Sequence, residues 1–186
     1  MSWLSTLEDY AAKYADQLRI NRFFRVDSKD GPGMGAFIGY ANRIFDFHLT
    51  NDRGDFLITF LNESWFSRIK SGFLFRSKAN FSSDGVGLSV ILALVAAAKN
   101  GKEFSELSAS EKPEYWKIQY SLEDPFAAFF ANLKGISEML RRTKSTKLKM
   151  WIESYCKGLV EWRYGPNAVE RTLTQEERDR FPPTKF

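Results

Sequence analysis

The chain has 186 residues, of which 44% are hydrophobic and 16% aromatic, with a formal net charge of +4 and a pI near 9.1. This apolar content is enough for a packed core and excludes a globally disordered chain. The single cysteine, Cys156, excludes an internal disulfide framework and points to a reducing compartment. The small charge excess does not suit a chain that binds nucleic acid over its whole surface. The length predicts one domain, residues 1–186, with residues 166–186 as a C-terminal tail.

The first expected element is an amphipathic helix over residues 3–20, because apolar side chains recur there at helical spacing. Ser5, followed three residues later by Glu8, is predicted to cap this helix. Acidic residues near the start differ from the lysine-then-apolar pattern of a secretory signal, so a cytoplasmic location is predicted. Residues 21–26 can form a short strand, whereas the turn-forming run 27–35 is predicted to be irregular.

Residues 36–61 are predicted to form a β-hairpin, because two aromatic and β-branched runs flank the polar block Asn51-Asp-Arg-Gly54. Strand alternation places apolar side chains on one face, at Phe45, Phe47, Leu49, Phe56, Ile58 and Phe60. That face is predicted to pack against helices. The opposite face carries Asp46, His48 and Thr59, and is predicted to be partly wet.

Helices are expected to follow the hairpin. A nearly all-apolar run over residues 86–99, with Asp84 before it and Gly101 after it, predicts a buried helix too short to span a membrane. Asp124-Pro125 opens a second helix, and a third begins after Thr143. The pattern is α+β: an antiparallel sheet of three to four strands preceded by one helix and followed by several packing helices.

No stretch carries a specific catalytic signature. His48 and Cys156 are each the single residue of their type, and a catalytic pair would also need a group that orients the histidine. Cys156 falls beside a helical apolar stripe, where a small buried thiol is the usual finding. The chain is therefore predicted not to be an enzyme, and a hydrolase built on His48 is the least favoured hypothesis.

Metal and cofactor sites are not predicted either. Asp46 and His48 share a strand face, but one histidine with scattered carboxylates lacks the spacing of a metal site. The better interpretation of the polar block is structural, with Asn51 and Asp52 forming the turn and Gly54 taking a positive φ. The glycines near residues 31–35 and 85–87 lack the context of a phosphate-binding loop, so no cofactor is expected.

One run of basic residues departs from the otherwise even distribution of charged residues along the chain. It contains Lys134, Arg141, Arg142, Lys144, Lys147 and Lys149, with Glu138 as its one acidic residue. Cations near a helix C-terminus interact favourably with the helix dipole, so a solvated face is the default explanation. A nucleic-acid surface would place aromatic side chains beside them, whereas Trp151 and Tyr155 fall on an apolar stripe. A nucleic-acid-associated accessory function using the Lys134–Lys149 run is therefore the alternative hypothesis.

The sequence of the hairpin is similar to that of a known class of proteins. The block Phe37-Ile-Gly-Tyr40, continued by Ile44-Phe-Asp-Phe-His-Leu-Thr-Asn-Asp-Arg-Gly-Asp-Phe56, resembles bacterial immunity proteins, small cytoplasmic α+β proteins that neutralise polymorphic or contact-dependent toxins. The similarity covers residues 20–62 and consists of an early antiparallel sheet with an Asn-Asp-Arg-Gly-like turn, followed by helices. It implies a non-enzymatic protein that binds a cognate protein toxin.

The net charge of +4 departs from the acidic character of many immunity proteins that block nucleases. If the resemblance holds, the toxin is acidic or is blocked without charge mimicry. The resemblance carries no binding residues over to this chain. The predicted partner-binding surface is instead the mixed face of the hairpin with its turns, where charges surround the single histidine. Its residues are Arg43, Asp46, His48, Asp52 and Arg53.

Overall fold

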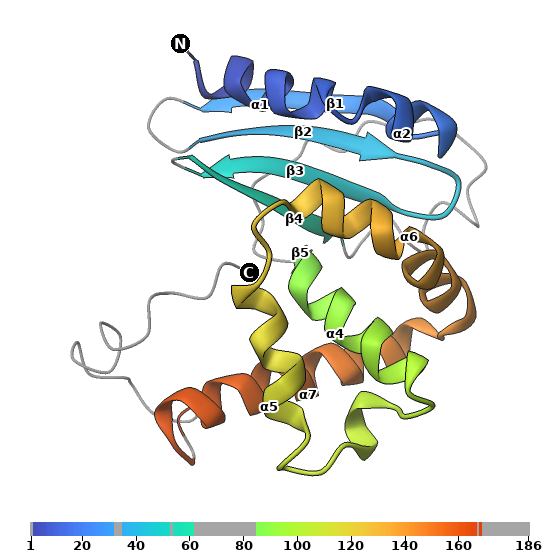
Figure 1. Cartoon of the computed structure of the whole chain (residues 1–186), viewed down its shortest axis with the longest axis vertical. Helices are drawn as coiled ribbons and strands as arrows, with labels where there is room; N and C mark the ends of the chain where they lie inside the picture. Colours follow the sequence, from blue (N-terminus) through green and yellow to red (C-terminus); the bar gives the residue numbers. More distant parts are fainter. Residues whose placement is uncertain (1, 32–34, 53, 62–84, 167, 169–186) are drawn as a thin grey trace. The chain divides into compact units, whose positions relative to one another are not determined.

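The structure of the chain is a computed structural model. It describes residues 2–31, 35–52, 54–61, 85–166 and 168 (Figure 1). Asp84, which was expected to precede the buried helix, and most of the expected tail lie outside the described residues.

The chain divides into two compact units. The sheet unit comprises Met1–Leu88 and Asp124–Arg141, and the helical unit comprises Ser89–Glu123 and Arg142–Phe186. The predicted α+β class is confirmed, because an antiparallel sheet is combined with helices before and after it. The single domain over residues 1–186 stays a prediction.

The sheet has five strands in the order β1-β2-β3-β4-β5, each antiparallel to its neighbours, rather than the three to four predicted. Their bounds are β1 Phe24–Gly31, β2 Gly35–Ala41, β3 Asp46–Asp52, β4 Asp55–Leu61 and β5 Gly85–Gly87. Because β2, β3 and β4 follow one another in the chain and in space, the predicted hairpin lies at the centre of the sheet.

Two strand segments contradict the sequence predictions. The run after Val26 was expected to be irregular, yet Asp27 to Gly31 continues β1. An edge strand with exposed side chains tolerates this polar sequence, because burial is not required of it. The glycines of β5 were expected to belong to a helix cap; instead β5 pairs with β4. A Cβ on Gly85 would collide with the Thr59 side chain, so glycine is what allows the two strands to lie so close.

The hairpin turn differs from the prediction in one respect, because Asn51 and Asp52 end β3, paired with Phe56 and Asp55, instead of forming the turn. The predicted positive φ at Gly54 is confirmed. The buried Asn51 accepts a hydrogen bond through Oδ1 from the backbone N–H of Gly54 at 2.8 Å. Gly54 has φ of +100°, a conformation that suits glycine. Phe47 lies opposite Phe60 across β3 and β4, which fixes the register of the apolar face.

Three helices belong mainly to the sheet unit: α1 Trp3–Ala12, α2 Ala15–Ile20 and α6 Pro125–Arg142. The expected single helix over residues 3–20 is thus broken between α1 and α2. Its cap is Ser2 rather than Ser5, because Ser2 Oγ accepts the Ser5 backbone N–H at 3.0 Å. Asp124 caps α6 as predicted, since its Oδ1 accepts the Ala127 N–H at 3.0 Å.

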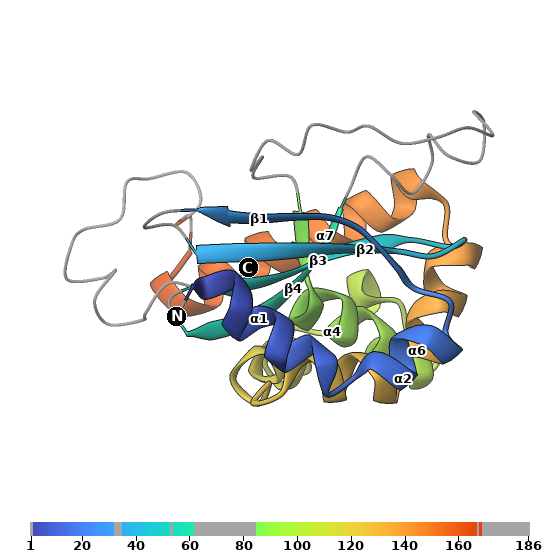
Figure 2. The ribbon, with the colours of Figure 1, turned by 90° about the horizontal axis from the view of Figure 1, so that it is seen from above.

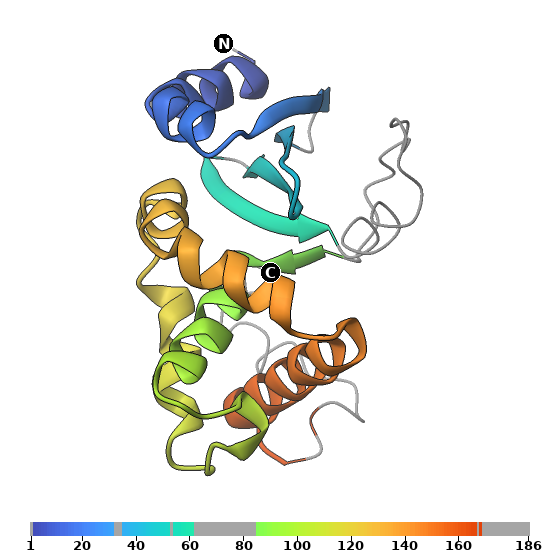
Figure 3. The same cartoon turned by 90° about the vertical axis from the view of Figure 1, so that its right-hand side faces the viewer.

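All three helices lie on one side of the sheet, which we call the helix face (Figures 2 and 3). The Phe47 ring lies 4.8 Å from the Phe129 ring of α6, and the stacked rings of Tyr10 and Phe56 are 4.1 Å apart. The Phe-rich face of the hairpin therefore packs on helices as predicted, and Phe45, Phe47, Leu49, Ile58 and Phe60 are buried there.

The helical unit is built from α4 Leu88–Lys99, η1 Phe104–Glu106, α5 Lys112–Trp116, η2 Lys117–Tyr120 and α7 Ser145–Tyr164. The predicted apolar helix is mostly buried, and it ends at Lys99, two residues before Gly101, whose φ is +71°. The rings of Phe104 and Tyr155 lie 5.2 Å apart in its core. None of the helices in the described stretches is long and apolar enough to cross a membrane.

Gly158 allows α7 to approach α5 closely. A Cβ at this position would lie 2.8 Å from Cζ2 of the buried Trp116 ring. Alanine normally favours a helix over glycine, but here the overpacking should outweigh that gain. We expect Gly158→Ala to lower the free energy of unfolding by about 1 kcal/mol, measured by urea denaturation. In a Trp116→Leu background the same change should no longer be unfavourable; a persistent loss would place the clash elsewhere.

Candidate functional site

The outer face of the sheet, opposite the helix face, holds the single histidine. Strand alternation and register place Phe37, Gly39 and Ala41 of β2 on this face, beside Asp46 and His48 of β3. His48 lies directly opposite Gly39. The imidazole stacks on the Phe37 ring, with the ring centroids 4.5 Å apart and the planes at 23°.

An irregularity in β1 brings two more side chains to this position. The register between β1 and β2 shifts between Arg25 and Asp27, so that Val26 is the extra residue of a β-bulge. A Cβ on Gly39 would lie 3.4 Å from Val26 Cγ2, 3.5 Å from Asp27 Cβ and 3.4 Å from His48 Cδ2. The side chains of Val26, Asp27 and His48 therefore converge over Gly39, which is buried beneath them.

The electrostatics of His48 follow from this setting. Burial lowers the pKa of His48, and the Asp27 carboxylate partly opposes that shift. Since the ordinary value is near 6.5, the imidazole is neutral at pH 7. A neutral imidazole has one donor and one acceptor nitrogen, so it can form hydrogen bonds with a partner without introducing a buried charge.

Two large apolar side chains stand exposed at the same edge. Phe24 is 68% exposed and Val26 is 45% exposed. Phe24 lies opposite Ala41, which places it on the outer face. In contrast, Arg25 points to the helix face, where its guanidinium contacts the Glu8 carboxylate at 2.8 Å. We call the outer-face group the outer-edge patch, defined by Phe24, Val26, Asp27, Gly39 and His48.

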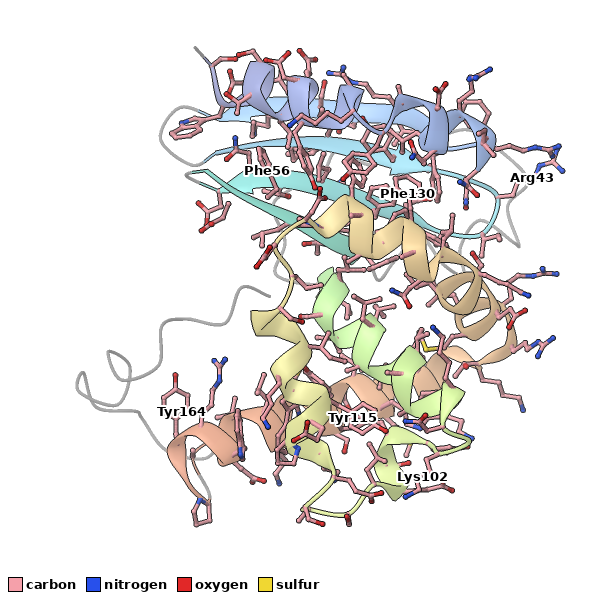
Figure 4. The ribbon with its side chains drawn as sticks, in the orientation of Figure 1. Arg43, Phe56, Lys102, Tyr115, Phe130 and Tyr164 are labelled. Carbon is pink, nitrogen blue, oxygen red and sulfur yellow. The ribbon has the colours of Figure 1, made fainter. Side chains whose placement is uncertain are left out.

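The residues predicted to bind a partner do not form one cluster. Arg43 is exposed in the turn that joins β2 to β3, at one end of the sheet (Figure 4). Asp46 is only 3% exposed, and it therefore offers little surface to a partner. Asp52 is exposed at the other end of β3, about 13 Å along the strand from His48. Arg53 lies outside the described residues.

The outer face, which was expected to be partly wet, therefore differs in solvent exposure from one residue to the next. His48 and Thr59 are half-buried, whereas Phe37 and Asp46 are buried. Sequence reasoning missed Phe24, Val26 and Asp27, which belong to a segment expected to be a short strand followed by a loop. The Phe-x-Val spacing was the available signal, but a bulge has no sequence signature that would have placed Val26 and Asp27 side by side.

The other candidate chemistries gain no support. Cys156 lies in α7 of the helical unit, and burial raises the pKa of its thiol, which is the opposite of what activates a nucleophile. No group of three or more His, Cys, Asp or Glu side chains among the described residues is arranged to hold a metal ion.

The basic run is partly neutralised within the chain. Lys147 contacts the Glu103 carboxylate, and its ammonium lies 5.2 Å from the centre of the Trp151 ring. Lys149 Nζ is 3.9 Å from the Glu153 carboxylate. Nucleic-acid binding through this run stays a prediction. It requires an affinity that falls steeply with salt, which an electrophoretic mobility assay at two ionic strengths would measure.

Comparison of the sequence with protein-family profiles and with curated proteins, and of the fold with solved structures, gave no match. The residues and geometry of this chain are thus the basis for a functional proposal.

Proposed function

We propose that this chain is a non-enzymatic binding protein that docks a partner protein on the outer-edge patch, and that the partner is a cognate bacterial toxin. The observation that supports it is the exposure of Phe24 and Val26 on the edge strand β1, at the same edge of the outer face that carries the half-buried His48 of β3. Interface energy is concentrated in a few aromatic and apolar anchors that lose contact with water on binding. Phe24 is the largest side chain available for that role in the patch.

The shape of the patch suits side-chain docking better than strand addition. The bulge at Val26 interrupts the regular backbone pattern of β1, and charged side chains at Asp27, Lys29 and Asp30 discourage pairing with another strand. A partner can instead contact the exposed side chains of Phe24 and Val26. The charged residues around these two side chains would then steer association more than they add affinity.

The choice of a toxin as partner rests on the resemblance of residues 20–62 to bacterial immunity proteins. In that function the chain would form a 1:1 complex and cover the active site of the toxin. The direct test is to express the product of the neighbouring gene alone and together with the chain, and to measure growth. Killing by that product alone and protection by the chain are the expected results. No killing by the product alone, or continued killing while the chain is expressed and folded, would contradict the proposal.

The patch itself is tested by Phe24→Asp. Placing a carboxylate at the anchor should weaken binding of that toxin by about 30-fold or more, measured by isothermal titration calorimetry. Met150→Asp is the matched control, because Met150 is also apolar and 66% exposed but lies on α7 of the helical unit. Its affinity should equal that of the unchanged chain. Equal affinities for all three proteins would remove the patch from the proposal.

A further inference from the structure

A separate cleft lies on the helix face of the sheet unit. Its volume is about 440 Å³, and it lies between α2, the turn after β2 and the middle of α6. The lining residues are Gln17, Asn21, Asn42, Ile44, Phe130, Leu133, Lys134 and Ser137. The cleft is shallow and largely open to solvent, so it would cover only part of a small molecule.

The floor of the cleft is apolar surface that the fold leaves partly uncovered. Phe129 and Ile136 of α6 are fully buried, but Phe130 and Leu133 of the same helix are only half-buried. Ile44, in the turn after β2, is also half-buried and lines the same space. Phe130 lies at this end of the sheet unit (Figure 4). Covering these three side chains would be favourable.

The rim presents both hydrogen-bond donors and acceptors. Asn21 Nδ2 donates to the Gln17 backbone carbonyl at 2.8 Å, so Oδ1 is the atom that this amide offers to a ligand. Asn42 Oδ1 already accepts the backbone N–H groups of Ile44 at 2.8 Å and Phe45 at 3.0 Å, so Nδ2 is the atom of that amide suited to a ligand. Ser137 adds a hydroxyl, and the exposed Lys134 adds an ammonium. Among the described residues that line the cleft, Lys134 is the one charged side chain.

We propose that this cleft binds a small carboxylic acid with an apolar body. The carboxylate pairs with Lys134, and the apolar body covers Ile44, Phe130 and Leu133. One ammonium balances a singly charged group, whereas a phosphate group would leave excess negative charge above an apolar floor. The site uses none of the residues of the outer-edge patch, so it is independent of the proposed toxin binding.

The test is an NMR titration of the full chain with 3-phenylpropanoate, compared with the uncharged 3-phenylpropanamide. Saturable shifts are expected at the cleft residues, and the acid should bind about fivefold more tightly than the amide, because a partly exposed ion pair adds a modest increment. Lys134→Met should remove that difference. Lys29→Met, which removes an exposed lysine on β1, should leave it unchanged.

A second variant tests the space rather than the charge. Ser137→Phe places a ring in the cleft and should abolish the shifts while the thermal midpoint stays the same. Three outcomes would overturn the proposal: no saturable shift in the unchanged chain, equal affinities for acid and amide, or tight binding that survives Ser137→Phe. The titration does not involve the toxin, so failure here leaves the proposed function standing, and the reverse also holds.

Discussion

Phe129→Ala should lower the free energy of unfolding by about 4 kcal/mol, because it removes a fully buried ring from the centre of the sheet unit. The Phe129 ring lies 4.8 Å from that of Phe47, 6.1 Å from that of Phe45 and 6.2 Å from that of Phe60. Phe47 and Phe60 belong to the sheet and Phe45 directly precedes β3, so their backbone cannot move in to fill the space left by the deletion. Urea denaturation should show a lower midpoint with an unchanged slope.

Phe130→Ala is the matched comparison, because the neighbouring ring is half-buried and lines the cleft. Its side chain contacts other rings mainly within the helix layer, with Tyr14 at 5.9 Å and Phe126 at 5.5 Å. The expected loss is about 1.5 kcal/mol, since part of that surface already faces water. Equal losses for the two variants would mean that the cleft is filled in solution and that Phe130 belongs to the core.

The part of the fold that could be predicted is the part with strong periodicity. Alternation in the run from Phe45 to Leu49 fixed which side chains face the helices, because a slip of one residue would turn all of them to the other face. The Asp124-Pro125 pair marked the start of α6, since both residues act within the first turn. Local chemistry was sufficient in both places.

The errors fall where partners distant in sequence decide the structure. The second half of β1 is too polar to be recognised as a strand, and pairing with β2 holds it in one. Two of the three residues of β5 are glycines, which disfavour strands, and the close approach to Thr59 requires glycine at Gly85. The break between α1 and α2 likewise has no proline or glycine to announce it.

The candidate sites also contain some features that local sequence patterns predict and others that depend on residues distant in the sequence. Alternation was enough to place His48 on the face opposite the helices, but the outer-edge patch also needs the bulge at Val26. The cleft needs more still, because Asn21, Asn42 and Leu133 come from three elements whose relative placement no local pattern contains. Interaction sites made of separate elements are the features that sequence periodicity misses most readily.

Asp124→Ala should lower the free energy of unfolding by about 3 kcal/mol, because one carboxylate stabilises both the start of α6 and the helix layer. Asp124 Oδ1 accepts the Tyr10 hydroxyl at 2.6 Å and the Ala127 N–H, and Oδ2 accepts the Tyr14 hydroxyl. The Tyr10 oxygen in turn accepts the Phe126 N–H at 3.1 Å. The change therefore removes a helix cap and leaves two phenols without their acceptor.

Asp16→Ala is the control for this change. Asp16 lies on α2, is 80% exposed and contacts Arg19 at 3.0 Å. An exposed pair of this kind contributes little, so the loss should stay within about 0.5 kcal/mol. A similarly small loss for Asp124→Ala in thermal or urea denaturation would show that water replaces the carboxylate and that the two tyrosines do not depend on it.

The effect of Asp124→Ala should also depend on pH at both extremes. Burial alone would raise the pKa of Asp124, but the hydrogen bonds from Tyr10, Tyr14 and the backbone outweigh it and lower the pKa. Its stabilisation is therefore complete above the unfolded-state pKa of about 3.9 and is lost as the pH falls through the lower folded-state value.

Tyr10 and Tyr14 determine the pH above which this stabilisation is lost. Burial, followed by the hydrogen bond to Asp124, raises the pKa of Tyr14 to about 12, and burial likewise raises that of Tyr10. A raised pKa gives stability that is complete below the unfolded-state value of about 10 and is lost as the pH rises through the folded-state value. The difference between the unchanged chain and Asp124→Ala should thus be constant from about pH 5 to about pH 9 and shrink on either side. A difference that stays constant at both extremes would mean that the carboxylate acts by packing and not by its charge.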